Sequence, residues 1–263
     1  MHLPRLRLLR RFTRSRECPD GKVYAGVCNI CGSRRGFCHS PSAHPREGFA
    51  CLECTSTSRD RMLIKTLGDC LGLTGALEEW PRQPLTLLET SGYRATPARL
   101  AQKFRYVNLM YASQGEDDYV QGDLSRLGLR DGTLDVLLTS DVFEHVREDA
   151  PAWAEVYRVL APGGYLLLQV PAVGEMETTE VRVEVRDGED VHLMEPEYHA
   201  EQTLVYRYYG DDLLGRLCEL GFAVMALRRR YPKFQIGEQT IVVAQKAPFV
   251  AMGPDEISER AWT

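Results

Sequence analysis

The chain has 263 residues, of which 44% are hydrophobic and 26% charged, and its formal net charge is −5. This composition excludes a disordered chain and predicts a packed core, with room for one domain and a small module. The negative charge argues against a general nucleic-acid binder, because phosphate binding needs a basic surface. No run of about 18 apolar residues predicts a transmembrane helix, and the N-terminus lacks the apolar core of a signal peptide. We therefore expect a cytoplasmic protein with reduced cysteines.

The chain begins with a basic segment, residues 1–17. Its first 16 positions hold six of the 32 basic residues and no acid, which leaves 26 basic and 37 acidic residues after them, a net charge of −11. Residues 5–16 could make a weak contact with an anionic surface. A frayed basic tail, or a helix docked on the acidic body, explains the same residues without a partner.

Residues 18–56 are rich in Cys, Gly, Ser and Pro, so they need a cross-link or a bound metal ion in order to fold. The stretches "CNIC" and "CLEC" form two C-x2-C pairs separated by 19 residues, and their cysteines are Cys28, Cys31, Cys51 and Cys54. Four thiolates on two tight turns can close a tetrahedral site that suits Zn²⁺, and the spacing is typical of zinc sites. Because four cysteines leave no open position, we expect a structural zinc ribbon; two disulfides or an iron centre are the alternatives.

Four cysteines lie outside these two pairs. Cys38, together with His39, could replace one of the zinc ligands, although both more simply belong to the hairpin between the pairs. Cys18, Cys70 and Cys218 are interpreted as ordinary thiols. Residues 57–84 are predicted to form a helix with an apolar stripe around Met62 and Leu67, followed by the linker "EEWPRQP".

From residue 85 to residue 246, short apolar strands alternate with helices, which predicts a mostly parallel sheet covered on both faces. Asp149 is positioned to cap one of the helices, and "VEVRDGED" predicts a hairpin that turns at Asp187 and Gly188. Ligands of such sheets bind beyond the carboxyl ends of the strands. Residues 247–263 are left as a C-terminal tail. Strands are expected at 85–89, 105–109, 118–121, 134–139, 164–170, 222–229 and 239–245, and helices at 95–104, 149–160 and 210–220.

Four pieces in order carry a family resemblance: "LTLLETSGYRA", "YVNLMYAS", "QGDLSRL", and "LDVLLTSDVFEHV" with the following "AWAEVYRVLAPGGYLLLQVP". Together they resemble the class I S-adenosylmethionine-dependent methyltransferases of the type 11 group. The later stretch "EYHAEQTLVYRYYGDDLLGRLCELGF" is similar to bacterial members with a cysteine-rich N-terminal module. The resemblance implies an α/β, Rossmann-like, seven-stranded and mostly parallel sheet, whose last strand at 239–245 runs antiparallel.

The resemblance also implies roles for individual positions. Glu89, Thr90, Ser91 and Gly92 of the first loop would hold the methionine part of S-adenosylmethionine. Met110 stands where the family binds the ribose. Asp123 and Leu124 would hold the adenine, and Ser140 and Asp141 would line the amino-acid end of the cofactor.

This chain departs from the family pattern at two places. Tyr93 and Arg94 occupy positions where the family has glycines, which let the backbone approach the ligand. Met110 replaces an acid that binds the ribose hydroxyls, and its absence costs about 1.5–3 kcal/mol, the scale of a charged hydrogen bond. Asn108 or Gln114 could compensate for the missing acid.

The proton acceptor for methyl transfer is expected among the histidines. His145 follows the fourth strand, and the stretch "DVHLMEPEYHAE", residues 190–201, would pass over the site as a lid that carries His192, Tyr198 and His199. A solvated polar loop explains the same stretch equally well, and the absence of an H-x-x-x-H spacing argues against a second metal there. We expect methyl transfer from S-adenosylmethionine to a small-molecule or glycan-like acceptor, with His145 or His199 as the base. The alternatives are the same fold with a repurposed pocket, and a non-catalytic zinc-ribbon binding module.

Overall fold

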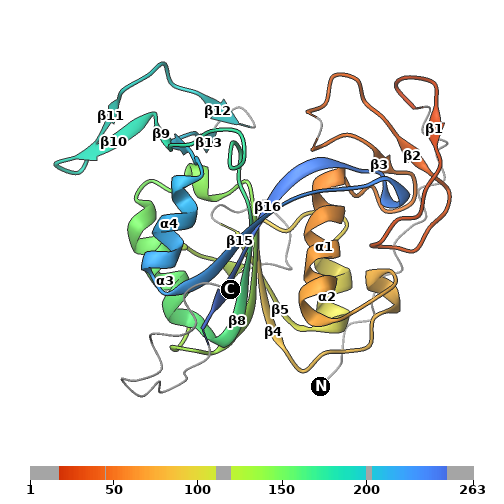
Figure 1. Ribbon diagram of the computed structural model, residues 1–263, viewed down its shortest axis with the longest axis horizontal. Coiled ribbons are helices and arrows are strands. Elements are labelled where there is room, and N and C mark those ends of the chain that lie inside the picture. The colour runs from red at the N-terminus through yellow and green to blue at the C-terminus, as the bar shows by residue number, and fades with distance from the viewer. Residues whose placement is uncertain (1–17, 45, 111–119, 200–202, 248–263) are drawn as a thin grey trace, which may run out of the picture.

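The computed structural model describes residues 18–44, 46–110, 120–199 and 203–247. Its centre is a seven-stranded sheet with the order β15-β16-β8-β7-β4-β5-β6 (Figure 1). Six strands run in the same direction, whereas β16 is antiparallel to both of its neighbours. The predicted sheet and its antiparallel last strand are therefore confirmed. The strands are β4 (Thr86–Thr90), β5 (Arg105–Met110), β6 (Val120–Gln121), β7 (Leu134–Ser140), β8 (Leu160–Gln169), β15 (Phe222–Tyr231) and β16 (Ile236–Lys246).

The register of the central strands sets the position of the site. Glu89 of β4 pairs with Asn108 of β5 on one side and with Leu138 of β7 on the other. Because the three strands are parallel, their last residues, Thr90, Met110 and Ser140, reach the same edge of the sheet. Loops that carry ligand-binding groups are expected at this edge.

Two helices cover each face of the sheet (Figure 1). The helices α1 (Ser58–Leu71) and α2 (Pro97–Lys103) share one apolar core with the cysteine-rich module, and α3 (Asp149–Val159) and α4 (Asp212–Glu219) share the core of the other face. The helix α1 begins with a capping box between Thr57 and Asp60. The predicted cap of α3 is wrong: Asp149 lies inside the first turn, where it accepts hydrogen bonds from Trp153, Tyr209 and Arg216.

The stretch expected to be a linker is packed against the protein. Residues Leu77–Glu79 form a short 3-10 helix, and the side chain of Trp80 is only 3% exposed. Trp80 lies directly over Gly68 of α1, where a Cβ atom would come within 2.9 Å of the indole. The absence of a side chain at Gly68 thus allows the stretch to pack closely on α1.

The cysteine-rich module contains three short antiparallel strands, β1 (Val23–Tyr24), β2 (Phe37–Cys38) and β3 (Ala50–Cys51). Arg61 of α1 attaches the module to the rest of the protein. Its guanidinium is fully buried, lies over the ring of Phe37 and donates hydrogen bonds to four backbone carbonyls, those of Phe49, Ser56, Phe234 and Gln235. The bonds to Phe49 and Ser56 lie in the module, and the other two reach the β15–β16 connection.

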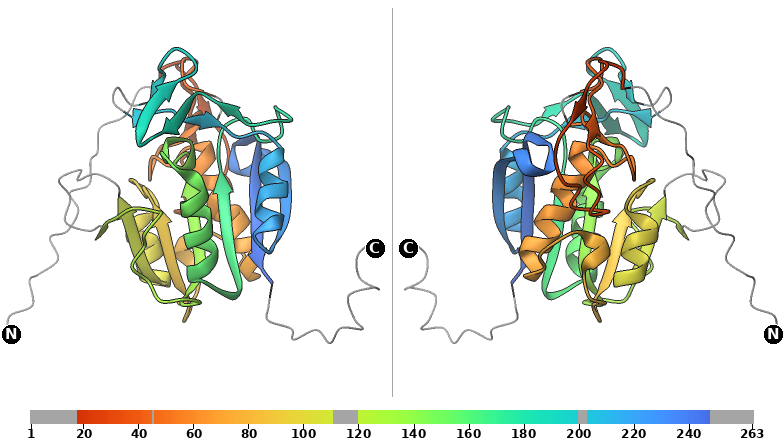
Figure 2. Two further views of the ribbon diagram at one scale, coloured as in Figure 1. Left: turned by 90° about the vertical axis from the view of Figure 1, so that its left-hand side faces the viewer. Right: turned by 90° about the vertical axis from the view of Figure 1, so that its right-hand side faces the viewer.

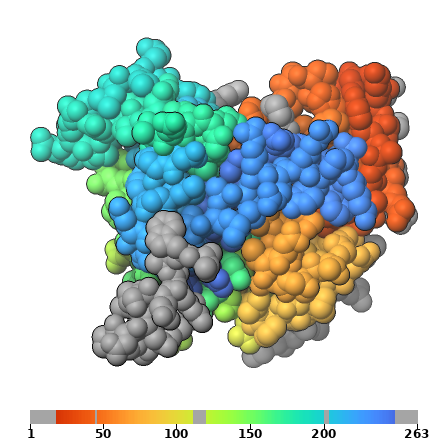
Figure 3. Space-filling model, in the orientation of Figure 1, coloured from red at the N-terminus to blue at the C-terminus, as the bar shows by residue number. Residues whose placement is uncertain are grey.

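Residues 177–199 and 203–209 are named the lid segment here, and their strands are short and paired. These are β9 (Glu180–Val181), β10 (Val183–Arg186), β11 (Glu189–His192), β12 (Tyr198–His199), β13 (Thr203–Leu204) and β14 (Arg207–Tyr208). The hairpin predicted at Asp187 and Gly188 is confirmed by the β10–β11 pair, and both turn residues have positive φ. The lid segment and the cysteine-rich module lie beyond the same end of the sheet (Figures 1 and 2) and form separate lobes on the surface (Figure 3).

Among the described residues, no helix is long and apolar enough to cross a membrane. The basic segment 1–17 and nearly all of the C-terminal tail fall outside those residues, as does Gln114. The proposed contact of residues 5–16 with an anionic surface therefore stays a prediction.

Candidate active site

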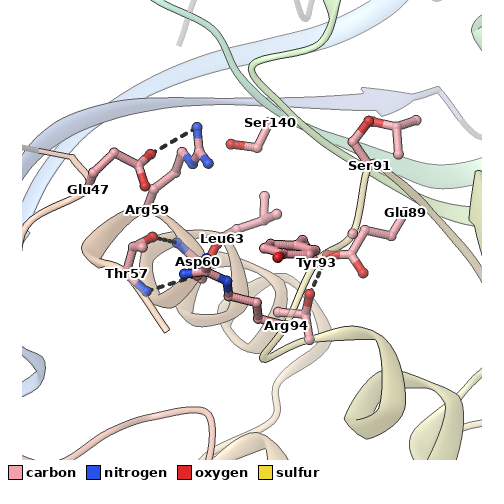
Figure 4. Close-up of a pocket in the computed structure, with 13 residues that line it drawn as sticks. Glu47, Thr57, Arg59, Asp60, Leu63, Glu89, Ser91, Tyr93, Arg94 and Ser140 are labelled. Carbon is pink, nitrogen blue, oxygen red and sulfur yellow. Dashed lines mark hydrogen bonds and ion pairs between the residues drawn. The ribbon is translucent and has the colours of Figure 1, made fainter. Parts of the chain in front are cut away.

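A cavity of about 280 Å³ opens at the edge of the sheet where β4 and β7 end (Figure 4). Its walls come from three parts of the chain: the cysteine-rich module with the start of α1, the loop after β4, and the end of β7. The lining residues are Glu47, Thr57, Arg59, Asp60, Leu63, Glu89, Thr90, Ser91, Gly92, Tyr93, Arg94, Thr96 and Ser140. The loop predicted to hold the methionine part of a cofactor is thus one wall of a cavity.

Glu89 is the buried acid of this loop. Its carboxylate accepts hydrogen bonds from the hydroxyl of Thr96 at 2.7 Å and from that of Tyr106 at 2.5 Å. Burial raises the pKa of Glu89 to about 7, and the two hydrogen bonds only partly offset it. A Cβ atom at Gly92 would come within 2.3 Å of the Glu89 carboxylate, so glycine is required there for the loop to lie against the acid.

Asn108 fixes the same loop from the neighbouring strand. Its side-chain oxygen accepts from the backbone N–H of Gly92 at 3.0 Å, and its side-chain nitrogen donates to the Gly92 carbonyl at 3.0 Å. These bonds occupy the amide in holding the loop, which removes Asn108 as the substitute for a ribose-binding acid. Tyr93 and Arg94 line the cavity beside this anchored glycine, and Arg94 has a φ of 57°, in the left-handed region.

The positions expected to bind the nucleoside follow along the edge. Met110 is the last residue of β5 and is partly exposed, as the predicted alignment requires. Asp123 accepts hydrogen bonds from the backbone N–H and the hydroxyl of Ser125 through one carboxylate oxygen, and the adjacent Leu124 is buried.

Asp141 is held by the cysteine-rich module. Arg46 and Arg59 each form an ion pair with a different oxygen of its carboxylate, and Arg59 also pairs with Glu47. Asp141 has a φ of 51°, and its N–H donates to the Gln169 carbonyl at 2.9 Å. This contact brings the module directly to the end of β7.

His145 and His199 lie together, on the short 3-10 helix Phe143–His145 and on the lid segment respectively. Nε2 of His145 is 3.2 Å from Nδ1 of His199, and Nδ1 of His145 is 2.8 Å from the carbonyl oxygen of Leu204. Because a carbonyl only accepts, Nδ1 of His145 carries the hydrogen, and Nε2 of the neutral ring has a free lone pair. Burial lowers the pKa of His145, which favours this neutral form.

The remaining candidates of the lid segment do not join this pair. His192 is exposed on the β10–β11 hairpin, and Tyr198 is 53% exposed. Glu197 does take part, since its carboxylate accepts from the Tyr208 hydroxyl, which lies 3.3 Å from Nε2 of His199. Glu201 falls outside the described residues.

The four cysteines of the predicted zinc site converge. Their sulfur atoms all lie within 4.8 Å of one another, and the pairs Cys28–Cys54 and Cys31–Cys51 are 3.6 and 3.8 Å apart. A tetrahedron with Zn–S bonds of about 2.3 Å has edges of about 3.8 Å, so the donor set fits zinc. One cysteine prediction is wrong: Cys18 forms a disulfide with Cys38, which also removes Cys38 as a substitute ligand.

Sequence reasoning missed Arg46 and Glu47 of the cysteine-rich module, and Arg59 in the first turn of α1. The capping box Thr57–Asp60 marks the start of α1 in the sequence. No local pattern, however, shows that this helix start faces Asp141, which lies 82 positions beyond Arg59.

Comparisons with known proteins agree with the order of these elements. Residues 82–168 match the family model described as a methyltransferase domain. An uncharacterized 37.1 kDa protein in a Streptomyces fradiae transposon, TN4556, is 46% identical over 50 residues, which cover 19% of this chain and 14% of the relative's length.

Two of the solved structures similar to this chain are methyltransferases. The Burkholderia thailandensis 1,6-didemethyltoxoflavin-N1-methyltransferase, solved with 1,6-didemethyltoxoflavin and S-adenosylhomocysteine, is 19% identical with a TM-score of 0.47, over 71% of this chain and 77% of that one. An S-adenosylmethionine-dependent methyltransferase from Mesorhizobium loti is 16% identical with a TM-score of 0.43, over 63% of this chain and 93% of its own.

Proposed function

We propose that this chain transfers a methyl group from S-adenosylmethionine to a small-molecule or glycan-like acceptor, a proposal supported by the match of residues 82–168 to the methyltransferase domain model. The observation that carries the proposal is the meeting of the Glu89 loop, Asp123 and the end of β7 at one edge of the sheet, next to the histidine pair.

The donor set of the cavity supports an amino-acid cofactor. Arg59 offers a cation for its carboxylate, while Glu47 and Asp60 offer anions for its ammonium group. The hydroxyl of Thr90 is buried without a hydrogen-bond partner and belongs to the same cavity wall. Glu89 would support the conformation of the loop.

The other predicted positions keep their proposed roles. Ser91 and Gly92 would present backbone groups to the methionine part, Asp123 and Leu124 would hold the adenine, and Ser140 and Asp141 would line the amino-acid end. Met110 would lie against the ribose and leave its hydroxyls without a charged partner. The bound cofactor would supply a methyl group already activated by the sulfonium.

The protein would then position the acceptor and remove its proton. Nε2 of His145 has a free lone pair and is our first candidate for the base. His199, whose Nδ1 lies 3.2 Å from Nε2 of His145, is the second candidate. We assign zinc to Cys28, Cys31, Cys51 and Cys54 as a structural ion, since four cysteines leave no open position.

The boundaries 18–56 for the zinc module, 57–84 for the helix and linker, and 85–246 for the methyltransferase domain stay predictions. So does the cytoplasmic location, and the Cys18–Cys38 disulfide weighs against a reducing compartment.

Calorimetric titration of the full chain with S-adenosylmethionine and with S-adenosylhomocysteine tests the proposal. We expect one site per chain for both ligands, and loss of binding in Gly92→Val, whose side chain would displace the loop. Lys22→Ala, a change at an exposed position of the cysteine-rich module, serves as the control. The absence of binding to either ligand in a folded, zinc-loaded protein would favour the alternative of a repurposed pocket, which Met110 and the occupied Asp141 carboxylate also favour.

A further inference from the structure

Glu144 is the side chain that methyl transfer leaves unexplained. It is 0% exposed, and neither of its carboxylate oxygens has a hydrogen-bond partner among the described residues. A carboxylate buried in this way is unfavourable unless it is neutralised or meets a cation. Burial raises the pKa of Glu144 to about 8, with the nearby charge of Asp141 adding to the effect.

The two ring nitrogens described above lie beside this carboxylate. Nε2 of His145 is 3.8 Å from Oε1 of Glu144 and 3.2 Å from Nδ1 of His199, and the three donor atoms all lie within 4.8 Å of one another. Ligands bound about 2.0–2.2 Å from one ion are separated by about 3–4 Å, so these atoms can share a cation after small movements.

The surroundings of both rings are typical of metal-binding histidines, whose other nitrogen is held by a carbonyl or a carboxylate. For His145 the holder is the carbonyl oxygen of Leu204, at 2.8 Å from Nδ1. For His199 the holders are the Tyr208 hydroxyl and the Glu197 carboxylate, at 3.3 and 3.8 Å from Nε2. Each ring therefore keeps one nitrogen available for an ion.

We propose that Glu144, His145 and His199 form a second metal site, which binds a divalent transition-metal ion such as Mn²⁺ through one carboxylate and two imidazoles. Such a donor set leaves coordination positions open, in contrast to the four cysteines. Nitrogen and oxygen donors suit Mn²⁺, whereas the sulfur site selects softer ions, so the two sites are chemically distinct.

The role of this ion rests on the proposed function. Held by these three residues, the ion would acidify an acceptor hydroxyl at an open position, whose proton would pass to water, so that the histidines would act as ligands and the ion would replace the base. The acceptor oxygen would then form the bond to the methyl carbon while the carbon–sulfur bond breaks with its electron pair left on sulfur. The inference therefore narrows the acceptor to a molecule that presents a hydroxyl oxygen.

Electron paramagnetic resonance of Mn²⁺ tests the site in the full, zinc-loaded chain after weakly bound ions are removed. We expect one bound Mn²⁺ per chain, and at least tenfold weaker binding in Glu144→Gln and in His199→Ala. His192→Ala is the matched control, because His192 is an exposed histidine of the same lid segment and should leave the affinity unchanged. Equal Mn²⁺ affinity in the wild type and in Glu144→Gln, or an equal loss in His192→Ala, would overturn the proposal.

Thermal unfolding separates loss of the site from loss of the fold. Without metal, Glu144→Gln should be at least as stable as the wild type, because it removes the unpartnered carboxylate, yet Mn²⁺ should raise the melting temperature of the wild type alone. A Glu144→Gln protein that still gains stability from Mn²⁺ would contradict the site.

The two proposals fail in distinguishable ways. Mn²⁺ binding without binding of S-adenosylmethionine would keep the metal site and reject the methyltransferase proposal. Cofactor binding and methyl transfer that survive chelation, in a protein that takes up no Mn²⁺, would do the reverse.

Discussion

Met110 stands where the resemblance to the type 11 methyltransferases implies an acid that binds the ribose. It ends β5 at the edge where a ribose would lie, and the neighbouring Asn108 is occupied with the backbone of Gly92. Weak cofactor binding is the expected result.

Restoring the acid should strengthen binding. We expect Met110→Asp to bind S-adenosylhomocysteine about tenfold to a hundredfold more tightly, since a charged hydrogen bond contributes about 1.5–3 kcal/mol. Isothermal titration calorimetry measures the change, and Met110→Leu is the control that alters the side chain without adding charge. An unchanged or weaker affinity in Met110→Asp would show that the ribose does not lie at this position.

Glu89 predicts a dependence of stability on pH. Its pKa is about 7 in the folded protein against about 4.5 in the unfolded chain, so the folded state binds more protons between these values. The contribution of Glu89 to stability is therefore complete below pH 4.5 and declines as the pH rises through 7, by about 3 kcal/mol in all.

Glu89→Gln removes this titration. Urea unfolding at pH 5, 6, 7 and 8 should show that the stability of the variant relative to the wild type increases with pH. Glu144 titrates in the same range, but it is present in both proteins and cancels in the comparison. A constant difference across the four pH values would mean that Glu89 is not the titrating group.

At the level of elements, α1 connects the zinc module to the sheet. Its first turn supplies Arg59 and Asp60 to the cavity, and its next residue, Arg61, is the buried anchor of the module. Its guanidinium donates hydrogen bonds to four carbonyls from two distant parts of the chain.

Arg61→Met should therefore destabilise the protein by more than about 3 kcal/mol, because it leaves these carbonyls without donors. Chemical denaturation measures the loss. The matched control is Arg34→Met, at an exposed position of the same module, with an expected effect within about 0.5 kcal/mol. A similar effect in both variants would contradict the anchoring role of Arg61.

The sheet was accessible to sequence reasoning because its strands are short apolar runs that end on polar loops. The strand expected at 105–109 is found as β5, Arg105–Met110, whereas the antiparallel direction of β16 was implied by the family resemblance and not by the apolar runs. By contrast, the pairing of Arg46 and Arg59 with Asp141 depends on how two distant segments pack, which no local periodicity encodes. Asp149 fits a helix cap by sequence, but Tyr209 and Arg216 bind its carboxylate in the folded chain.

At the scale of the whole molecule, we expect the zinc site of the four cysteines to be coupled to the cavity. Removing zinc should disorder the turns around the four cysteines and thereby displace Glu47 and Arg59, which line the cavity. We expect elemental analysis to find one tightly bound zinc per chain, and chelation under denaturing conditions followed by refolding without metal to abolish cofactor binding. Readdition of zinc should restore it; full cofactor affinity in a verified zinc-free protein would refute the coupling.

Because separate parts of the chain line the cavity, a fragment of the chain can lose part of the cavity. The region matched as a methyltransferase domain, residues 82–168, ends before the lid segment and begins after Arg59. A fragment with those limits would lack one wall of the cavity, as well as His199. Exchange of modules between relatives should therefore change which molecules enter the cavity, even when the sheet and its loops are left untouched.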